Sequence, residues 1–249
     1  MSGHSKWSSI KHKKAVVDAR KGKLFTKLAR AITVAAKEGG GDIEGNPALA
    51  LAVSKARDAS MPKDNIERAI AKGPGAGADA DALENVVYEG YGPGGVAILV
   101  EAVTDNRNRT GAEMRHLFGK HGGNLGEPGS VAYLFDKKGV LAVDGERYGE
   151  DDLLPAIEAG AEDIAVDEDI FEVLTEPADV AAVRTALTEA GIEVQSAEVA
   201  HRPKTTVPLE EDGARKVLKL IDALEDNDDV DAVHANFDVS ADVMEAIAG

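Results

Sequence analysis

Apolar residues near the start of the chain recur at helical spacing. A helix is predicted by apolar positions three or four residues apart, which are Leu24, Leu28, Ile32 and Ala35. Basic residues at the same spacing form a second stripe on another face, made of Arg20, Lys23, Lys27 and Arg30. Consecutive glycines at 39–41 end this helix. We expect one face to pack and the basic stripe to be solvated.

Two shorter helices are predicted next. Asn46 and Pro47 supply an N-cap and a first-turn proline for the first of them. Ser60 and Pro62 supply an N-cap and a first-turn proline for the second helix. A run rich in glycine, alanine and aspartate then lacks apolar periodicity and indicates a linker. Residues 1–80 are therefore expected to form a helical domain with a linker.

The apolar period changes to that of strands after this linker. Residues 86–89 and 96–103 flank a glycine-rich turn and predict a hairpin. A helix follows residues 104–106, and a strand is predicted at 131–135. A late helix and the alternating strand near residues 233–239 would complete the same sheet. These segments predict a discontinuous α+β domain of residues 81–136 plus 204–249.

The intervening residues 137–203 have an element order of their own. The pattern is strand, helix, strand, strand, helix, strand, which is that of the ferredoxin-like fold. Pro177 and Gly191 mark the start and end of its second helix. The predicted fold class is therefore α+β with three domains, in which a ferredoxin-like domain is inserted into the middle one.

Charge is distributed unevenly along the chain. The first 30 residues carry nine basic residues and one acidic residue, or +8, whereas the remainder carries 19 and 44, or −25. A basic end on an acidic body predicts that a polyanion is held at that end and repelled elsewhere. The candidate nucleic-acid-binding residues here are Lys6, Trp7, Lys11, His12, Lys13, Lys14, Arg20, Lys21, Lys23, Lys27 and Arg30. Trp7 could stack on an unpaired base, although a role as a core anchor stays open.

A second candidate lies in the acidic body. Residues 105–110, Asp-Asn-Arg-Asn-Arg-Thr, follow a predicted central strand and begin a helix. Arg107 and Arg109 beside helix N–H groups could hold a phosphate or a base edge. The alternative is that these residues cap the helix and form salt bridges with the acidic surface.

The sequence predicts no enzyme. It has no phosphate-binding loop, no zinc-protease motif and no hydrolase nucleophile motif. The acidic run 225–231 departs from a calcium loop after its start, so it is interpreted as a solvated turn. We expect no cofactor, no metal, no catalytic residue and no small-molecule substrate.

The amino-acid composition indicates where in the cell the protein resides. Cysteine is absent, and no stretch reaches the length of apolar residues needed for a signal or a membrane span. We expect a soluble cytoplasmic protein without a membrane partner. A mitochondrial transit peptide is disfavoured because lysine dominates and the helical half is apolar on its packing face.

Several motifs together resemble the YebC/PmpR family, which also includes a mitochondrial translational activator. They are MSGHSKWSSIKHKK at 1–14, MPKDNIERAI at 61–70, YEGYGPGG at 88–95, TDNRNRT at 104–110, GGNLG at 122–126 and GSV at 129–131. The resemblance implies three domains around a central cleft. It also implies a cytoplasmic bacterial DNA-binding regulator of transcription, with some relatives acting in translation.

Three interpretations of the function remain, and two of them involve binding of nucleic acid. The first is a DNA-binding transcriptional regulator, and the alternative is a ribosome-associated translation factor that binds ribosomal RNA. Lysine and arginine neutralise phosphates of either polymer, so charge does not separate these readings. No helix-turn-helix spacing or zinc finger is evident for base readout. A scaffold whose acidic body binds basic proteins is the least favoured reading.

Overall fold

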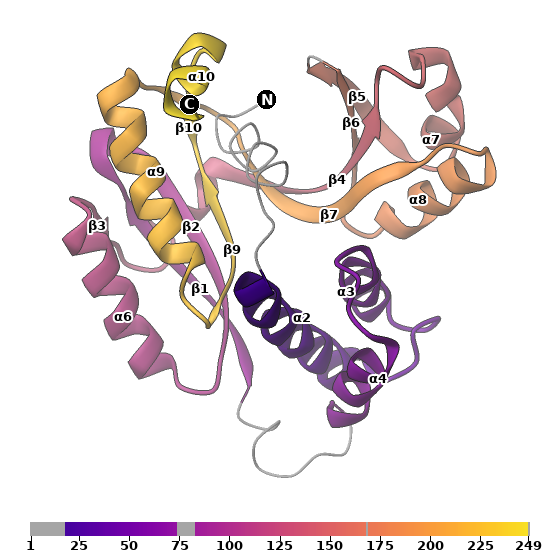
Figure 1. Ribbon diagram of the computed structural model, residues 1–249, viewed down its shortest axis with the longest axis horizontal. Coiled ribbons are helices and arrows are strands. Elements are labelled where there is room, and N and C mark those ends of the chain that lie inside the picture. Colours follow the sequence, from indigo (N-terminus) through magenta and orange to yellow (C-terminus); the bar gives the residue numbers. More distant parts are fainter. Residues whose placement is uncertain (1–17, 74–82, 168, 249) are drawn as a thin grey trace. The chain divides into compact units, whose positions relative to one another are not determined.

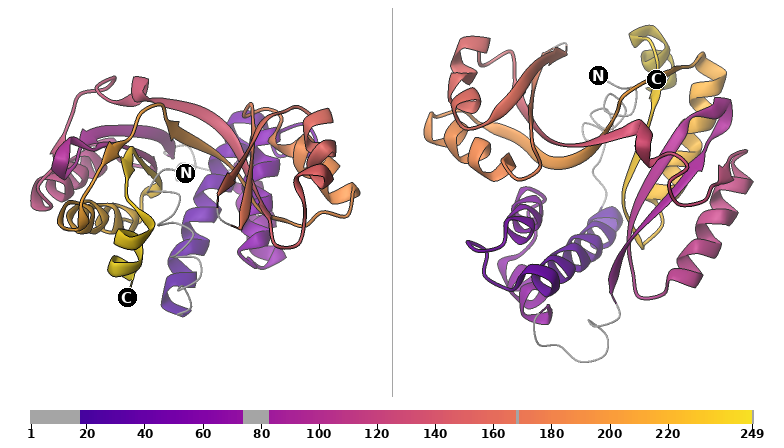
Figure 2. Two further views of the ribbon diagram at one scale, coloured as in Figure 1. Left: turned by 90° about the horizontal axis from the view of Figure 1, so that it is seen from above. Right: turned by 180° about the vertical axis from the view of Figure 1, so that it is seen from behind.

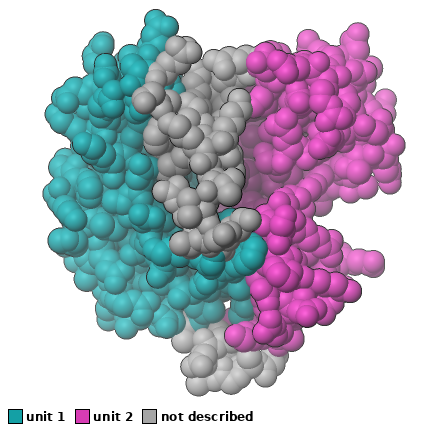
Figure 3. All heavy atoms as spheres, viewed as in Figure 1, with its two compact units in different colours: residues 1–34, 76–136, 202–249 teal, residues 35–75, 137–201 magenta. Residues whose placement is uncertain are grey.

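The structure is a computed structural model that describes residues 18–73, 83–167 and 169–248. Its contacts divide the chain into two compact units, each assembled from separate segments (Figure 3). Unit 1 comprises residues 1–34, 76–136 and 202–249, and unit 2 comprises residues 35–75 and 137–201. The fold is α+β, as predicted. The division into domains 1–80, 81–136 plus 204–249, and 137–203 stays a prediction.

Within the described residues, three helices come before the first strand (Figure 1). They are α2 (Asp18–Gly39), α3 (Pro47–Asp58) and α4 (Lys63–Lys72). The predicted cap at Asn46 is confirmed, since its Oδ1 accepts a hydrogen bond from the Leu49 N–H at 3.1 Å. Its Nδ2 donates to the carbonyl oxygens of Ala35 and Gly40 at 2.8 Å each. One buried amide therefore fixes the end of α2 to the start of α3.

The predicted cap at Ser60 is wrong. Ser60 has a φ of 60° and lies just past the end of α3. Its N–H bonds the Arg57 carbonyl at 2.8 Å, and the Met61 N–H bonds the Ala56 carbonyl at 2.8 Å. This pair of bonds is the Schellman arrangement that ends a helix, so Ser60 terminates α3 instead of starting α4.

A four-stranded sheet forms the centre of unit 1. Its order is β3-β1-β2-β9, and each pairing is antiparallel. The strands are β1 (Glu84–Tyr91), β2 (Ala97–Thr104), β3 (Asn124–Leu125) and β9 (Val230–Ala235). The predicted hairpin is confirmed by the register, which runs from Glu84 opposite Thr104 to Tyr91 opposite Ala97.

Two helices cover one face of this sheet, as Figures 1 and 2 show. They are α6 (Arg107–Lys120) and α9 (Glu211–Glu225). Their apolar faces bury Phe118 and Ile221 completely against β2, where Ile98 is also fully buried. The smaller elements of unit 1 are η1 (Pro93–Gly95), η2 (Ala132–Leu134), β8 (Val207–Pro208), β10 (Phe237–Asp238) and α10 (Ala241–Ala248).

The strand predicted at 131–135 is wrong. Residues 132–134 form the short helix η2, and β4 begins only at Phe135. The cause is the buried carboxylate of Glu89, which accepts the N–H groups of Gly129, Val131 and Ala132 at 2.6 to 2.7 Å. Burial alone would raise the pKa of Glu89, but these three bonds hold it below its ordinary value. The carboxylate thus holds residues 132–134 in a helical turn, although their apolar pattern predicts an extended strand.

The ferredoxin-like order is confirmed, mostly within unit 2. The sheet order is β5-β6-β4-β7, with β6 antiparallel to both β4 and β5. Its elements are β4 (Phe135–Asp144), η3 (Glu150–Leu153), α7 (Leu154–Glu158), β5 (Ala161–Asp167), β6 (Ile170–Thr175), α8 (Val180–Glu189) and β7 (Val194–Pro203). The core joins Leu141 and Val173 of the sheet to Leu187 of α8, all fully buried.

Helix α3 adds to this unit. Leu51 packs against the same core, and the Arg184 guanidinium of α8 donates to the Asp58 carboxylate at 3.1 Å. In the described stretches of the chain, no helix is both long and apolar enough to cross a lipid bilayer.

The first prediction concerns residues 137–203 expressed alone. Because the β-α-β-β-α-β elements close their own two-layer core, this fragment should unfold cooperatively on heating. Its midpoint should lie below that of a longer fragment that includes α3, since Leu51 and Asp58 are then missing. Calorimetry with amide hydrogen exchange tests this. A broad transition without protected amides would show that the domain boundaries are wrong.

Candidate nucleic-acid interface

The described structure contains only part of the predicted interface. Outside the described residues lie Lys6, Trp7, Lys11, His12, Lys13 and Lys14. Arg20 and Lys21 belong to the first turns of α2. The described side chains of the prediction are Lys23, Lys27, Arg30, Arg107 and Arg109, and all belong to unit 1.

The basic stripe of α2 faces residues 225–231, which we call the acidic segment. The Lys23 Nζ lies 3.6 Å from the Asp228 carboxylate and 3.5 Å from the Asp226 carbonyl oxygen. The Lys27 Nζ donates to the Glu225 carbonyl at 2.5 Å. Burial lowers the pKa of Lys27, and the neighbouring carboxylates oppose that shift. The expectation that this stripe and this acidic run are both simply solvated is therefore wrong.

The end of α9 explains why the lysines bind there. The last carbonyl groups of a helix have no partner within the helix, and they carry the negative end of its dipole. α9 ends at Glu225, so the carbonyls of Glu225 and Asp226 are of this kind. Lysine ammonium groups supply the missing donors together with a complementary charge.

Asp229 is the most constrained residue of the acidic segment. Its side chain is only 6% exposed. Its Oδ1 accepts a bond from Arg30 Nη1 at 2.8 Å, and its Oδ2 accepts bonds from Arg109 Nη2 at 2.8 Å and Thr110 Oγ1 at 2.7 Å. Thr104 Oγ1 lies 3.4 Å from the same Oδ2. One carboxylate thus joins α2, the end of β2 and the start of α6.

The ionised form of Asp229 is favoured by these bonds. Burial by itself would raise the pKa of Asp229, because a charge is costly away from water. The hydrogen bonds from Arg109, Thr110 and Arg30 outweigh that cost and hold the pKa below its ordinary value. The site is therefore a fixed negative charge at neutral pH.

The two arginines of the 105–110 motif differ in their surroundings. Asn106 caps α6, accepting the Arg109 N–H at 3.1 Å, and the Arg109 guanidinium also bonds Asp105 at 2.8 Å. These contacts match the capping and salt-bridge alternative. The Arg107 side chain is 64% exposed, and its nearest carboxylate, that of Glu84, is 3.7 Å away. The Arg109 side chain is 44% exposed, so Arg107 is the more exposed and the less constrained of the two arginines.

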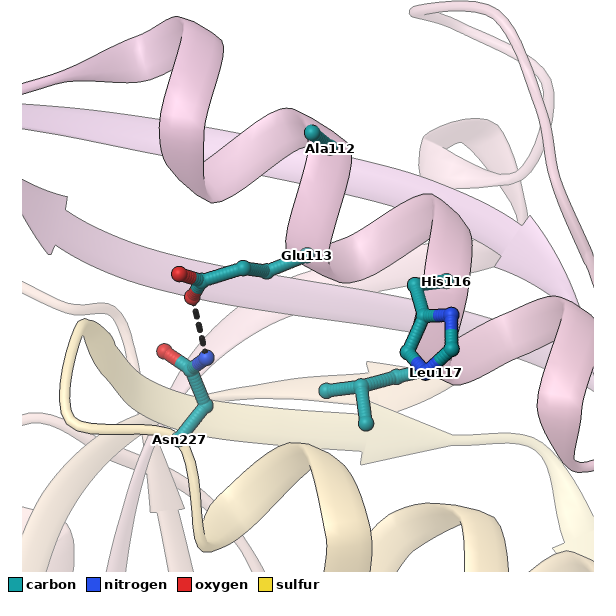
Figure 4. A pocket seen from close by; sticks show the side chains of 5 residues that line it. All are labelled: Ala112, Glu113, His116, Leu117 and Asn227. Carbon is teal, nitrogen blue, oxygen red and sulfur yellow. Dashed lines mark hydrogen bonds between the residues drawn. The ribbon is translucent and has the colours of Figure 1, made fainter.

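The other side of the acidic segment meets α6 at a shallow pocket of about 330 Å³ (Figure 4). It is lined by Ala112, Glu113, His116, Leu117 and Asn227. Across it, the Asn227 Nδ2 donates to the Glu113 carboxylate at 2.7 Å. Within the described stretches, no cluster of three or more histidine or acidic residues is arranged to hold a metal ion.

Sequence reasoning missed Asp229, Thr104 and Asn227 as site residues. The acidic run suggests a solvated turn when it is considered alone. The only available signal is that Asp229 immediately precedes the buried strand residue Val230. That position indicates that the carboxylate is buried, but it does not indicate which residues donate hydrogen bonds to it.

Comparisons with known proteins cover nearly the whole chain. A family model described as the TACO1/YebC protein N-terminal domain matches residues 5–76, and one described as the TACO1/YebC second and third domain matches residues 83–237. A "Probable transcriptional regulatory protein" of Rubrobacter xylanophilus is 59% identical over the full length of both chains. One of the same name from Acidothermus cellulolyticus is 56% identical over 98% of this chain and 99% of its own.

A solved structure is similar as well. The crystal structure of a conserved hypothetical protein from Aquifex aeolicus has a TM-score of 0.81 and 47% sequence identity. The match covers 90% of this chain and 93% of the other.

The second prediction concerns Asp229. Asp229→Asn leaves two arginines facing a neutral amide, so unfolding at pH 7 should need about 3 kcal/mol less free energy. Because the folded pKa is lowered, the stabilisation is present above the unfolded pKa of about 3.9 and is lost as the pH falls through the folded value. Urea unfolding from pH 7 down to pH 3 should show the two proteins converging in acid.

The control for this experiment is Asp228→Asn, whose side chain is 67% exposed. That change should alter the unfolding free energy by no more than about 0.5 kcal/mol. Equal losses in both variants would contradict the role given to Asp229.

Proposed function

The chain belongs to the TACO1/YebC family, and on that premise we propose that it is a nucleic-acid-binding regulator of gene expression that acts on transcription by binding DNA. The relatives' name supports a regulatory role. The observation that carries the binding proposal is the stripe of Lys23, Lys27 and Arg30 along one side of α2, which lies within the first 30 residues, whose net charge is +8. In this proposal the protein works in the cytoplasm, by binding and not by catalysis.

Charge elsewhere in the chain supports binding at the α2 end. Residues 137–201 hold 17 acidic and four basic residues, so the ferredoxin-like part repels a polyanion. Within unit 1, the exposed Arg107 at the start of α6 is a further cation that a phosphate could reach. Arg30 and Arg109 contribute indirectly, since both are committed to Asp229.

Ribosomal RNA is the alternative ligand. Phosphate contacts carry no sequence information, and ammonium groups bind the backbone of either polymer. The specific observation that favours RNA is Trp7, which lies between Lys6 and Lys11 in the sequence and could stack on an unpaired base.

The third prediction tests the stripe. Lys23→Gln together with Lys27→Gln removes two phosphate contacts, so the log-log slope of affinity against salt should fall by roughly 1.4 to 1.8 units. Arg30 is spared because its loss would also destabilise the fold. The measurement is fluorescence anisotropy with labelled duplex DNA and with a labelled RNA hairpin, from about 50 to 200 mM salt.

A matched control removes two exposed lysines of α9 in the same unit, with Lys216→Gln and Lys219→Gln. This variant should keep the wild-type slope. The proposal fails if the α2 variant binds as wild type does at every salt concentration.

The fourth prediction separates RNA from DNA. Deleting residues 1–14 removes Trp7 together with Lys6, Lys11, Lys13 and Lys14. If Trp7 stacks on bases, the loss should be greater on looped RNA than on duplex DNA, by roughly 1 to 3 kcal/mol. Trp7→Leu in the full chain isolates the ring from the charges. Equal losses on both polymers would indicate a purely electrostatic segment.

A further inference from the structure

We propose that the acidic segment is a built-in competitor of nucleic acid, occupying the phosphate-binding lysines of α2 until a polyanion displaces it. This inference rests on the proposed function and concerns the regulation of the same site. It assigns residues 225–231 a role that is neither a metal site nor a solvated turn.

The acceptors that face α2 resemble those of a nucleic-acid backbone. Lys23 and Lys27 meet a carboxylate and two main-chain carbonyls of the acidic segment, as given above. Arg30 Nη1 adds a bond to the Asp228 carbonyl at 3.0 Å. A phosphodiester offers the same kind of acceptor, an anionic oxygen with further lone pairs beside it. One set of cations therefore suits both ligands, but cannot bind both at once.

The two sides of the acidic segment are held differently. On the α6 side, Asn227 bonds Glu113, and the buried Asp229 bonds Thr110 and Arg109. On the α2 side, the Lys23 and Asp228 side chains are 57% and 67% exposed. Lys27 is partly buried there, and Arg30 keeps its bond to Asp229 when the lysines let go. Breaking the lysine contacts therefore leaves the acidic segment anchored, so the lysines can be exchanged without unfolding unit 1.

The balance between the two ligands favours a long polyanion. Exposed ion pairs contribute little because water and salt screen them. Nucleic acid additionally gains from the release of its condensed counterions, which the acidic segment cannot match. The segment therefore weakens binding to isolated or sparse phosphates more than binding to a continuous strand.

The test compares four full-length proteins on duplex DNA and on an RNA hairpin of matched length. Asp228→Asn removes the carboxylate that meets Lys23, and Asp226→Asn removes a neighbouring negative charge, while the main-chain carbonyls, Asn227 and Asp229 are kept. We expect the affinity of this variant for nucleic acid to rise about fivefold, the upper end of what loss of an exposed ion pair supplies. The matched control, Glu127→Gln with Asp242→Asn, neutralises two exposed acids of unit 1 away from the acidic segment. Its affinity should rise only about twofold, through the general field.

The fourth protein combines the Asp226 and Asp228 changes with Lys23→Gln and Lys27→Gln. If the acidic segment acts through these lysines, the gain should disappear in this protein. Acetylation of Lys23, whose ammonium group meets the Asp228 carboxylate, gives a second measurement by mass spectrometry without nucleic acid. It should be faster in the Asp226 and Asp228 variant than in wild type or the control, provided that melting curves show all proteins folded.

The outcomes separate the two proposals. The competitor proposal is overturned if affinity rises equally in the control, or if the rise in affinity remains after the lysines are replaced. Either result leaves the proposal of nucleic-acid binding intact. Unchanged acetylation of Lys23 also overturns it. Absence of salt-dependent binding in all four proteins overturns the proposed function, and the competitor with it.

Discussion

Burial of one carboxylate charge organises unit 1. Asp229 can be ionised away from water only because two guanidinium groups and a threonine hydroxyl bond it directly. Those donors come from α2 and α6, so satisfying the charge ties both helices to the residue that precedes β9. The adjacent backbone takes part as well, since the Val103 N–H bonds the Asp229 carbonyl at 2.7 Å. Glu89 does the same for residues 129–132 through backbone donors alone.

Features that depend on neighbouring residues could be predicted from the sequence. The caps at Asn46 and Asn106, the hairpin of β1 and β2, and the ferredoxin-like order each follow from local spacing and propensity. The errors have a common cause, which is a distant partner or a backbone bond that outweighs local preference. Glu89, 40 or more positions away in the sequence, accepts the N–H groups that bend residues 132–134 into a helical turn. Main-chain hydrogen bonds make Ser60 part of the end of α3. The Glu89 contact lies outside any local pattern, whereas the Ser60 bonds are local but require a positive φ that the N-cap pattern does not indicate.

The charge asymmetry found in the sequence also means something different once the chain is folded. The +8 of the first 30 residues and the acids near residue 228 were counted as independent surfaces, yet Lys23, Lys27 and Arg30 meet oxygens of that very segment. A cation paired within its own protein binds phosphate only by exchange. Net charge therefore indicates the class of ligand, whereas the contacts determine how readily each side chain reaches it. The Arg107 guanidinium, which is 3.7 Å from the Glu84 carboxylate and is largely exposed, needs the least exchange.

The contact between Arg30 and Asp229 joins positions 199 residues apart in the sequence. A ribosome adds about 5 to 20 residues per second, so roughly 10 to 40 s separate the synthesis of the two partners. Throughout that interval α2 has been translated while the acidic segment has not, and the nascent chain carries its lysines without their later partners. In every newly made copy these cations therefore precede their partners by that interval, and the contacts between them form only after the acidic segment has been synthesised.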